Sequence, residues 1–234
     1  MKNIFFVFSL FSAPLRFIFL ASQIPLFARN LIMKILSQEF YIQDDVVQLS
    51  RDLLGKFLMT NLEGDITGGM IIETEAYRGP EDKASHAYGN RRTKRTEAMF
   101  QKGGICYVYL CYGMHNLFNI VTNIEGTPHA ILVRAIWPTD GIENMLHRRK
   151  KTNVDSTLAN GPGTVTQALG IDTSHNGMLL TKQSIWVEDR GIKIHSKNIA
   201  VGPRIGIDYA KEDALLPWRF RLKKERKNNI MTFF

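Results

Sequence analysis

The sequence predicts a protein of mixed strands and helices in which at least two strands pair antiparallel. Residues 56–60 and 66–75 are strand-forming runs on either side of the turn Glu63-Gly64-Asp65, which is the pattern of a hairpin. Residues 105–112 and 130–136 are two further apolar runs of strand length. Helical patterns lie between and after these runs, so the chain indicates neither an all-β nor an all-α protein.

The other elements are expected as follows. Asp44 and Asp45 are N-cap candidates for a helix whose apolar residues recur at helical spacing as far as Phe57, with Gly55 near its end. Pro80 suits the first position of a short helix. The remaining predictions are helices at residues 141–151 and 164–169, strands at residues 118–121, 185–187, 199–201 and 204–207, and a closing segment at residues 217–221.

Composition limits the class of protein. A chain of 234 residues can form one domain with a sizeable core, or two small ones. Lys and Arg number 30 against 22 Asp and Glu, and this net charge of +8 favours an acidic partner, nucleic acid first. The two cysteines, Cys106 and Cys111, are five positions apart in one predicted strand and therefore face opposite sides. We expect no disulfide framework, no four-ligand zinc site and a reducing compartment.

The first 32 residues differ from the rest, because they are rich in Phe, Leu and Ile and carry few charges. Pro14, Arg16 and Pro25 interrupt this segment, so it lacks the roughly 20 uninterrupted apolar residues of a membrane span. We interpret it as an extension upstream of a start at Met33, with a signal peptide or anchor as the alternative. The expected organisation is an extension (1–32), a globular domain (33–222) and a basic tail (223–234), in a cytoplasmic protein with no membrane partner.

Acidic and aromatic side chains gather in residues 71–88. The strand there should project Glu73 and Glu75 from one face, roughly 6.5–7 Å apart. Tyr77 and His86 follow closely, around the strand break at Gly79-Pro80. Two carboxylates, aromatic rings and a histidine at one strand-to-turn junction indicate a functional site, since a core alone does not require them.

Three tyrosines occur in the strand predicted at residues 105–112. Tyr107 and Tyr109 share one face, and Tyr112 stands at the tip, before Gly113. A tyrosine in a strand is usually part of the core. Flat rings that face a pocket, however, also suit stacking on a nucleobase, and a ring at an exposed tip suits insertion between base pairs.

Two groups of positive charge remain open in their interpretation. The loop at residues 89–96 contains Arg91, Arg92, Lys94 and Arg95, which either face solvent or contact the phosphates of a nucleic acid. Arg134 lies inside an apolar run, where an unpaired charge is costly. It needs an acidic partner, which is either an arbitrary acid or Glu73 or Glu75.

A series of short motifs runs through residues 36–220 and is densest from residue 73 to 119. The motifs are Glu73-Thr74-Glu75-Ala76-Tyr77, Gly79-Pro80-Glu81-Asp82, His86, Met99-Phe100, Tyr107-Val108-Tyr109, Tyr112-Gly113-Met114, Asn119-Ile120, Leu132-Val133-Arg134-Ala135, Gly161-Pro162-Gly163 and Arg204-Ile205-Gly206-Ile207. In order and spacing they resemble the alkyladenine (3-methyladenine) DNA glycosylases of bacterial type. The resemblance implies a single α+β domain with a curved antiparallel β-sheet surrounded by helices.

It also implies a monofunctional enzyme of base-excision repair. Such an enzyme flips an alkylated or deaminated purine out of damaged double-stranded DNA and hydrolyses its N-glycosidic bond. We expect it to act as a monomer with no stable protein partner. A cationic alkylated base leaves without an acid, and a carboxylate can stabilise the positive sugar and accept a proton from water. No cofactor and no metal are therefore expected.

The resemblance assigns a role to each of seven residues. Glu75 is implied as the general base that activates water, and Arg134 as the residue that helps to hold that water. Tyr77, His86 and Tyr109 are implied as the walls of the base pocket. Asn119 is implied as the residue that excludes the guanine amino group, and Tyr112 as the one that fills the gap left by the flipped nucleotide. The residues alone do not choose Glu75 over Glu73, because both face the same way.

Three alternative functions compete with this interpretation. A glycosylase-lyase would use Lys83 as an amine nucleophile, but the neighbouring acids should keep it protonated. A metal-dependent nuclease would use Glu81, Asp82 and His86, although no second matching cluster of carboxylates occurs. A non-catalytic binder of damaged DNA would have no need of both Glu75 and Arg134.

Overall fold

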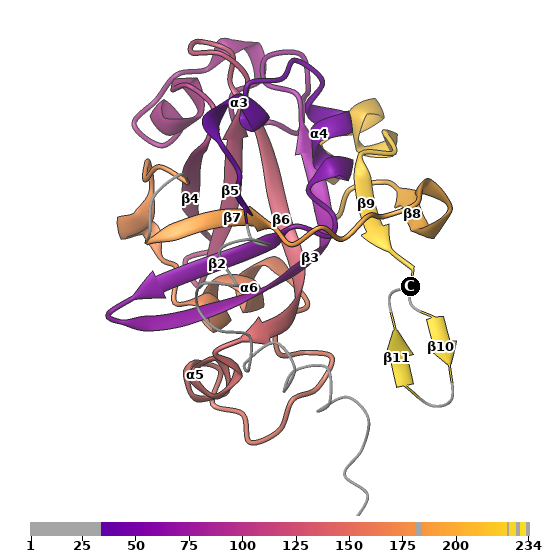
Figure 1. The fold of residues 1–234 in the computed structure, drawn as a ribbon. Coiled ribbons are helices and arrows are strands. Elements are labelled where there is room, and N and C mark those ends of the chain that lie inside the picture. Colours follow the sequence, from indigo (N-terminus) through magenta and orange to yellow (C-terminus); the bar gives the residue numbers. More distant parts are fainter. Residues whose placement is uncertain (1–33, 181–183, 224, 228–229, 233–234) are drawn as a thin grey trace, which may run out of the picture.

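The computed structural model describes residues 34–180, 184–223, 225–227 and 230–232, and these contain one large, strongly curled antiparallel sheet with helices around it (Figure 1). The predicted α+β single domain is confirmed. The strands of this sheet are β1 (Lys34–Ile35), β2 (Phe57–Leu62), β3 (Asp65–Tyr77), β4 (Ile105–Cys111), β5 (His115–Thr122), β6 (His129–Asp140), β7 (Ile185–Asp189), β8 (Ile199–Gly202) and β9 (Arg219–Leu222). A separate hairpin joins β10 (Glu225–Lys227) to β11 (Ile230–Thr232).

Helices and short 3-10 turns fill the connections. The α-helices are α3 (Gln38–Tyr41), α4 (Val46–Asp52), α5 (Ile142–Arg148) and α6 (Pro162–Leu169). The 3-10 helices are η1 (Tyr88–Asn90), η2 (Glu97–Phe100), η3 (Thr173–His175), η4 (Ser196–Asn198) and η5 (Asp208–Leu215). Asp45 caps α4 as predicted, because its carboxylate accepts hydrogen bonds from the amides of Val47 and Gln48 at 3.0 and 2.9 Å.

The long strand β3 lies at the centre of the sheet. It pairs along its length with β6, while β2 pairs with its first half and β9 with residues Glu73 to Glu75. The register between β3 and β6 shifts on both sides of Glu73, and such irregularities bend a strand and increase its twist. The sheet therefore curls, and β2 and β7 cross the view at a steep angle to β4, β5 and β6 (Figure 1).

The two faces of β3 serve different purposes. Thr74 faces α4, where its hydroxyl donates to the Ser50 carbonyl at 2.8 Å. Because side chains alternate along a strand, Glu73 and Glu75 point to the opposite face. Most of the buried apolar core, including Leu49, packs between the sheet and its helices, so the carboxylates lie on the other side of a well-filled layer.

Several predictions about individual elements are wrong in detail. Pro80 begins a series of turns rather than a helix, because Asp82 accepts the amide of Ala84 at 2.9 Å and pairs with Arg204. Residues 204–207 form a loop and do not continue the sheet. Phe57 belongs to β2 and not to the preceding helix, which ends at Asp52.

The hairpin between β2 and β3 is confirmed. Glu63 and Gly64 both adopt positive φ angles, of 57° and 88°, which is the geometry of a tight type I′ turn. Among the described residues, none of the helices is long and apolar enough to cross a membrane. The predicted extension at residues 1–32 lies outside the described residues, and its boundary with the domain stays a prediction.

Candidate active site

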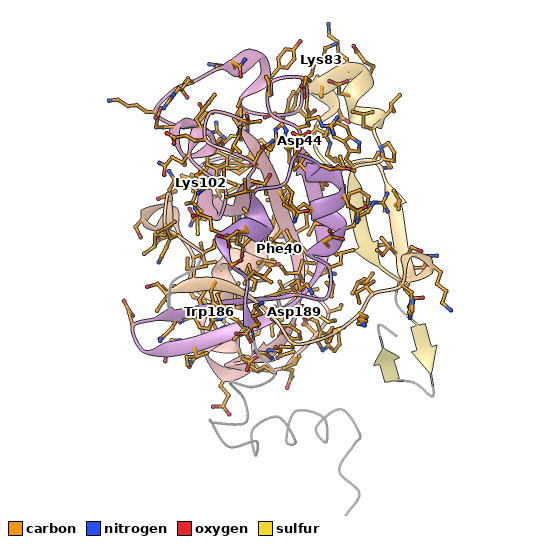
Figure 2. The ribbon with its side chains drawn as sticks, turned by 45° about the horizontal axis from the view of Figure 1, so that its top comes forward. Phe40, Asp44, Lys83, Lys102, Trp186 and Asp189 are labelled. Carbon is orange, nitrogen blue, oxygen red and sulfur yellow. The ribbon has the colours of Figure 1, made fainter. Side chains whose placement is uncertain are left out.

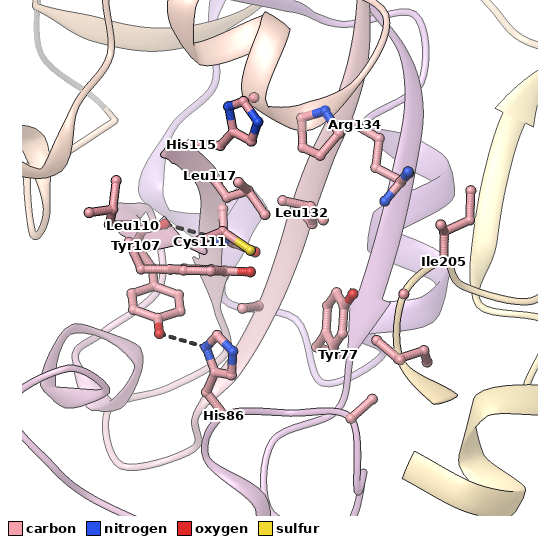
Figure 3. A pocket seen from close by; sticks show the side chains of 18 of the residues that line it. Tyr77, His86, Tyr107, Leu110, Cys111, His115, Leu117, Leu132, Arg134 and Ile205 are labelled. Atoms are coloured by element: carbon pink, nitrogen blue, oxygen red, sulfur yellow. Dashed lines mark hydrogen bonds between the residues drawn. The ribbon is translucent and has the colours of Figure 1, made fainter. Parts of the chain in front are cut away.

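A cavity of about 640 Å³ opens on the face of the sheet that carries Glu73 and Glu75. This volume lies within the usual range for a small-molecule site. Its walls come from β3, β4, β5 and β6, from the turns after β3, from the start of α6 and from the loop at residues 205–207 (Figure 3). Segments that are far apart in the sequence therefore meet at one cavity.

One transverse row of the sheet contributes Leu132, Asn119 and Tyr107 to the lining of the cavity and places the buried Glu75 beside them, behind the lining. Glu75 on β3 pairs with Leu132 on β6, Leu132 pairs with Asn119 on β5, and Asn119 pairs with Tyr107 on β4. Residues that pair directly across antiparallel strands lie on the same face. The register thus aligns the carboxylate, an apolar spacer, an amide and a tyrosine.

Glu75 is completely buried and is held by three groups that line the cavity. Its Oε2 accepts a hydrogen bond from the Tyr77 hydroxyl at 2.9 Å, and its Oε1 accepts one from the Ile205 amide at 2.9 Å. The Nη1 atom of Arg134 lies 3.3 Å from Oε1. The same arginine donates from Nε to Glu73 at 3.0 Å, so it pairs with both glutamates.

The electrostatics of Glu75 are a balance of opposing effects. Burial raises the pKa of Glu75, whereas the charge of Arg134 and the hydrogen bonds from Ile205 and Tyr77 lower it. The net direction is upward. The pKa of Tyr77 is also raised well above its usual value, by burial first and then by the Glu75 charge, so Tyr77 is a neutral hydrogen-bond donor at pH 7.

Aromatic rings form the opposite wall. His86 Nδ1 lies 2.8 Å from the Tyr107 hydroxyl (Figure 3). The His86 ring also meets that of Tyr109 edge to face, with centroids 4.7 Å apart. Tyr107 and Tyr109 share a face as predicted, with centroids 5.3 Å apart. Burial, assisted by the charge of Arg95, lowers the pKa of His86 to about 4, so this ring is neutral at pH 7.

Asn119 and Tyr112 occupy contrasting positions. Asn119 is 4% exposed, and its amide donates to the Tyr107 carbonyl at 3.1 Å while the side chain lines the cavity. Tyr112 is 86% exposed at the tip between β4 and β5, where it adopts a φ of 50°. Both residues border the same cavity. Of these two residues, Tyr112 projects from the cavity into solvent and Asn119 does not.

The four cations predicted to contact DNA divide into three groups. Arg95 lines the cavity, with its guanidinium 4.8 Å from the centre of the Tyr109 ring. Arg92 is an exposed residue that pairs with Glu97 at 2.6 Å. Arg91 and Lys94 are exposed and lie outside the cavity wall.

The structure does not favour the alternative chemistries. Lys83 is paired with Glu212 in η5 at the periphery of the molecule and does not line the cavity (Figure 2). Asp82 is engaged by Arg204, and His86 by Tyr107. Within the part of the chain that the structure describes, no three His, Cys, Asp or Glu residues gather in an arrangement that could hold a metal ion.

Sequence patterns alone assign no definite site role to two residues that matter for this geometry. For Tyr107 the pattern fits either the core or a pocket, and the structure makes Tyr107 the partner of both His86 and Asn119. Ile205 supplies an amide to Glu75 from 130 positions away. The only signal for Ile205 was its place in a short motif, because spacing cannot reveal a backbone donor on a distant loop.

A buried carboxylate behind an aromatic slot, with an exposed tyrosine at the rim, is the arrangement expected of a hydrolase that excises bases from DNA. The model of the methylpurine-DNA glycosylase family matches residues 39–226. A Chlamydia felis protein named "Putative 3-methyladenine DNA glycosylase" is 50% identical over 196 residues, which cover 83% of this chain and 100% of the relative. Proteins of the same name from Desulfitobacterium hafniense and Bacillus mycoides are each 44% identical, over 82% and 79% of this chain and 96% and 94% of the relatives.

The chain therefore belongs to the methylpurine-DNA glycosylase family. It is an enzyme of base-excision repair that hydrolyses N-glycosidic bonds and binds damaged DNA. The resemblance stated from the sequence motifs is confirmed.

Proposed function

We propose that this enzyme excises 3-methyladenine and related alkylated or deaminated purines from double-stranded DNA by hydrolysis at an everted nucleotide. The buried Glu75 carboxylate, held by three groups of the cavity wall, is the observation that carries this proposal. The names of the relatives support the choice of lesion. Eversion follows from chemistry, because the glycosidic bond of a stacked base is out of reach in a duplex.

Glu75 acts in this scheme as the general base. An ionised carboxylate has about four acceptor positions, and hydrogen bonds from Tyr77 and Ile205 occupy two of them, while Arg134 makes an ion pair at 3.3 Å. A remaining position can bind a water molecule, whose proton the carboxylate accepts as the base departs. The same negative charge stabilises the oxocarbenium character that develops on the sugar. Arg134 helps to hold the water, and its positive charge favours the ionised form of the carboxylate.

The slot between Tyr77 and the His86–Tyr109 wall receives the base. Electron-rich faces favour a cationic alkylated purine, and the neutral His86 adds no repulsion to such a base. Asn119 stands in the floor of the slot, where its amide excludes the exocyclic amino group of guanine. A cationic base is a good leaving group, so no cofactor or metal enters the scheme.

Tyr112 fills the space that the everted nucleotide leaves in the duplex. Its exposure and its place at a tight turn suit a ring that must enter between base pairs. Arg91, Arg92, Lys94 and Arg95 contact the DNA backbone around the lesion. The enzyme acts as a cytoplasmic monomer without a stable protein partner or a membrane.

The test uses duplexes that contain 3-methyladenine or hypoxanthine, incubated with the enzyme in EDTA. Free base and an intact strand with an abasic site are expected; a nicked strand would indicate lyase or nuclease chemistry. Glu75→Gln should bind an abasic duplex and release no base. Glu63→Gln, in the exposed β2–β3 turn, is the unaffected control. Normal turnover by Glu75→Gln would remove Glu75 from the mechanism.

A further inference from the structure

The loop at residues 203–207 delivers an amide to Glu75 although it belongs to no strand. Something other than a strand ladder must therefore fix its position. Arg204, next to Ile205 in the chain, is 5% exposed and points into the interior rather than into the cavity. Its guanidinium makes contacts in several directions.

The contacts of Arg204 reach three parts of the site. Its Nη1 donates to the carbonyl of Ala76, the residue between Glu75 and Tyr77, at 2.9 Å. Both terminal nitrogens bond the Asp82 carboxylate, the Nη2 contact being 2.8 Å, and Asp82 lies in the turns that carry His86. The guanidinium also stacks 4.8 Å from the centre of the Tyr77 ring.

This set of contacts differs from that of an ordinary buried ion pair. Nη2 donates to the Asp213 carbonyl at 3.1 Å, and the Trp218 ring lies 5.1 Å away on the guanidinium. A planar fork that fills such a site fixes both distance and orientation, which a lysine ammonium cannot reproduce. A buried ion pair by itself adds little to stability, since desolvation offsets most of the attraction. The arrangement is better explained by what it holds in place.

We propose that Arg204 is a positioning residue for the hydrolysis, in that one guanidinium fixes the Ile205 amide, the backbone beside Glu75 and the Tyr77 ring relative to the turns that carry His86. This inference rests on the proposed role of Glu75. Without the fork, the loop at residues 203–207 loses its anchor and Glu75 loses a well-aligned donor. The positive charge of Arg204 also favours the ionised form of Glu75.

Two variants test the proposal. Arg204→Lys keeps the charge and removes the fork, and the double variant Arg204→Met with Asp82→Asn removes both charges without leaving an unpaired ion buried. The matched control is Arg190→Lys. Arg190 is a partly buried arginine that pairs with Glu188 at 2.7 Å and with Asp140 at 2.9 Å, stacks on Phe57, and lies outside the cavity.

We expect Arg204→Lys to lower kcat on a 3-methyladenine duplex by about 10- to 100-fold, as small misplacements of reacting groups do. Binding of a duplex with a tetrahydrofuran abasic analogue should change by less than about threefold, because the rim is untouched. In the double variant the acidic limb of the kcat–pH profile should move to higher pH, because Glu75 loses a well-aligned donor while the opposite charges of Arg204 and Asp82 are removed together. Arg190→Lys should lower Tm and leave the profile unchanged.

Parental kcat in Arg204→Lys would overturn the proposal, and so would an unchanged kcat–pH profile in a folded double variant. Losses of kcat in Arg204→Lys that only match those of Arg190→Lys at equal Tm would overturn it as well. If the double variant fails to fold, Arg204→Lys decides the question alone. Glu75→Gln separates the two proposals. Turnover by Glu75→Gln refutes the base assignment itself, whereas an inactive Glu75→Gln beside a fully active Arg204→Lys refutes only the role of Arg204.

Discussion

Glu75 illustrates how one residue can work against the stability of its own fold. Burial raises its pKa in the folded state, while the unfolded chain has the ordinary value of about 4.5. A group with a raised folded pKa contributes its stability below the unfolded pKa and loses it as pH rises through the folded pKa. At neutral pH, which lies above the unfolded pKa, the buried Glu75 is therefore a net cost to the stability of the fold, which is common at active sites.

Glu75→Gln should accordingly be more stable than the parent at pH 7. Glutamine keeps the shape and an acceptor for the Ile205 amide but carries no charge. Each 1 kcal/mol gained raises Tm by about 2–4 °C in a domain of this size. Thermal unfolding at several pH values checks this, and the difference should shrink below about pH 4.5, where the parent is protonated in both states. A lower Tm for the variant at pH 7 would contradict the pKa direction.

The lowered pKa of His86 predicts that the protein loses stability as the pH falls, which is opposite to the effect of Glu75. Its folded pKa is about 4, lowered by burial first and by Arg95 second, whereas an unfolded histidine titrates near 6.5. Between these values the unfolded state binds more protons, so stability should fall as pH drops from about 6.5 to about 4. Urea unfolding across this window should show a shallower decline for His86→Gln than for the parent.

Two further histidines are needed to interpret the unfolding curves of His86→Gln. His129 is also buried with a lowered pKa, so part of the slope should persist in His86→Gln. His195 is exposed in the loop before η4, and His195→Gln is the matched control that should follow the parent curve. Parallel curves for all three proteins would show that His86 is already charged in the folded state at mildly acidic pH.

At the scale of elements, the hairpin of β4 and β5 carries the floor of the cavity at one end and Tyr112 at the other. The positive φ angles of Tyr112 and Gly113 turn the chain tightly, so the ring projects without a neighbouring loop to cover it. Leu110 and Met114 are exposed beside it. The β4–β5 hairpin thus presents an apolar tip beyond the end of the strand pair that carries Asn119.

Tyr112→Ala should lower kcat/KM on a duplex substrate by about 10- to 100-fold, the range expected for loss of one aromatic stacking contact. The loss should be much smaller on a single-stranded substrate, which has no gap to fill. Stability should not change, since the ring makes few contacts. Ile124→Ala, exposed in the turn between β5 and β6, is the control. Equal losses on both substrates would argue against insertion into the duplex.

How far the elements could be predicted depends on whether their signals are local. The β2–β3 hairpin and the Asp45 cap follow from turn and capping residues in a few positions, and both are confirmed. The row from Glu75 to Tyr107 depends on register across four strands, which periodicity does not fix. The helix expected at Pro80 fails for the same reason, because a distant arginine, Arg204, competes for Asp82.

The candidate site also combines features with local sequence signals and features that depend on long-range contacts. Glu73 and Glu75 on one face, and a pair of strand tyrosines, were predictable from alternation alone. Local chemistry could not rank the two glutamates. The contacts that distinguish them are long-range, since Glu75 receives the Ile205 amide and Glu73 lies against Arg219, while Arg134 pairs with both.

At the scale of the whole molecule, the net charge of +8 draws the enzyme to DNA, but individual cations should contribute unequally. Arg92 is already neutralised by Glu97 through two hydrogen bonds of 3.0 and 2.6 Å. In the described part of the chain, the side chains of Arg91 and Lys94 have no such partner and are exposed. Each phosphate contact steepens the dependence of log binding constant on log salt concentration by about 0.9.

The double variant Arg91→Ala with Lys94→Ala should therefore reduce that slope by about 1.8, measured as the affinity for an abasic-analogue duplex over a range of salt concentrations. Arg92→Ala should reduce it by less, because forming its phosphate contact requires breaking the pair with Glu97. Lys193→Ala is the control, since Lys193 is flanked by Ile192 and Ile194, which lie against Gly55 beside α4 and away from the cavity. If Lys193→Ala lowers the slope as much as the double variant, the DNA follows a different face of the protein, and the loop at residues 89–96 is only a solvated surface.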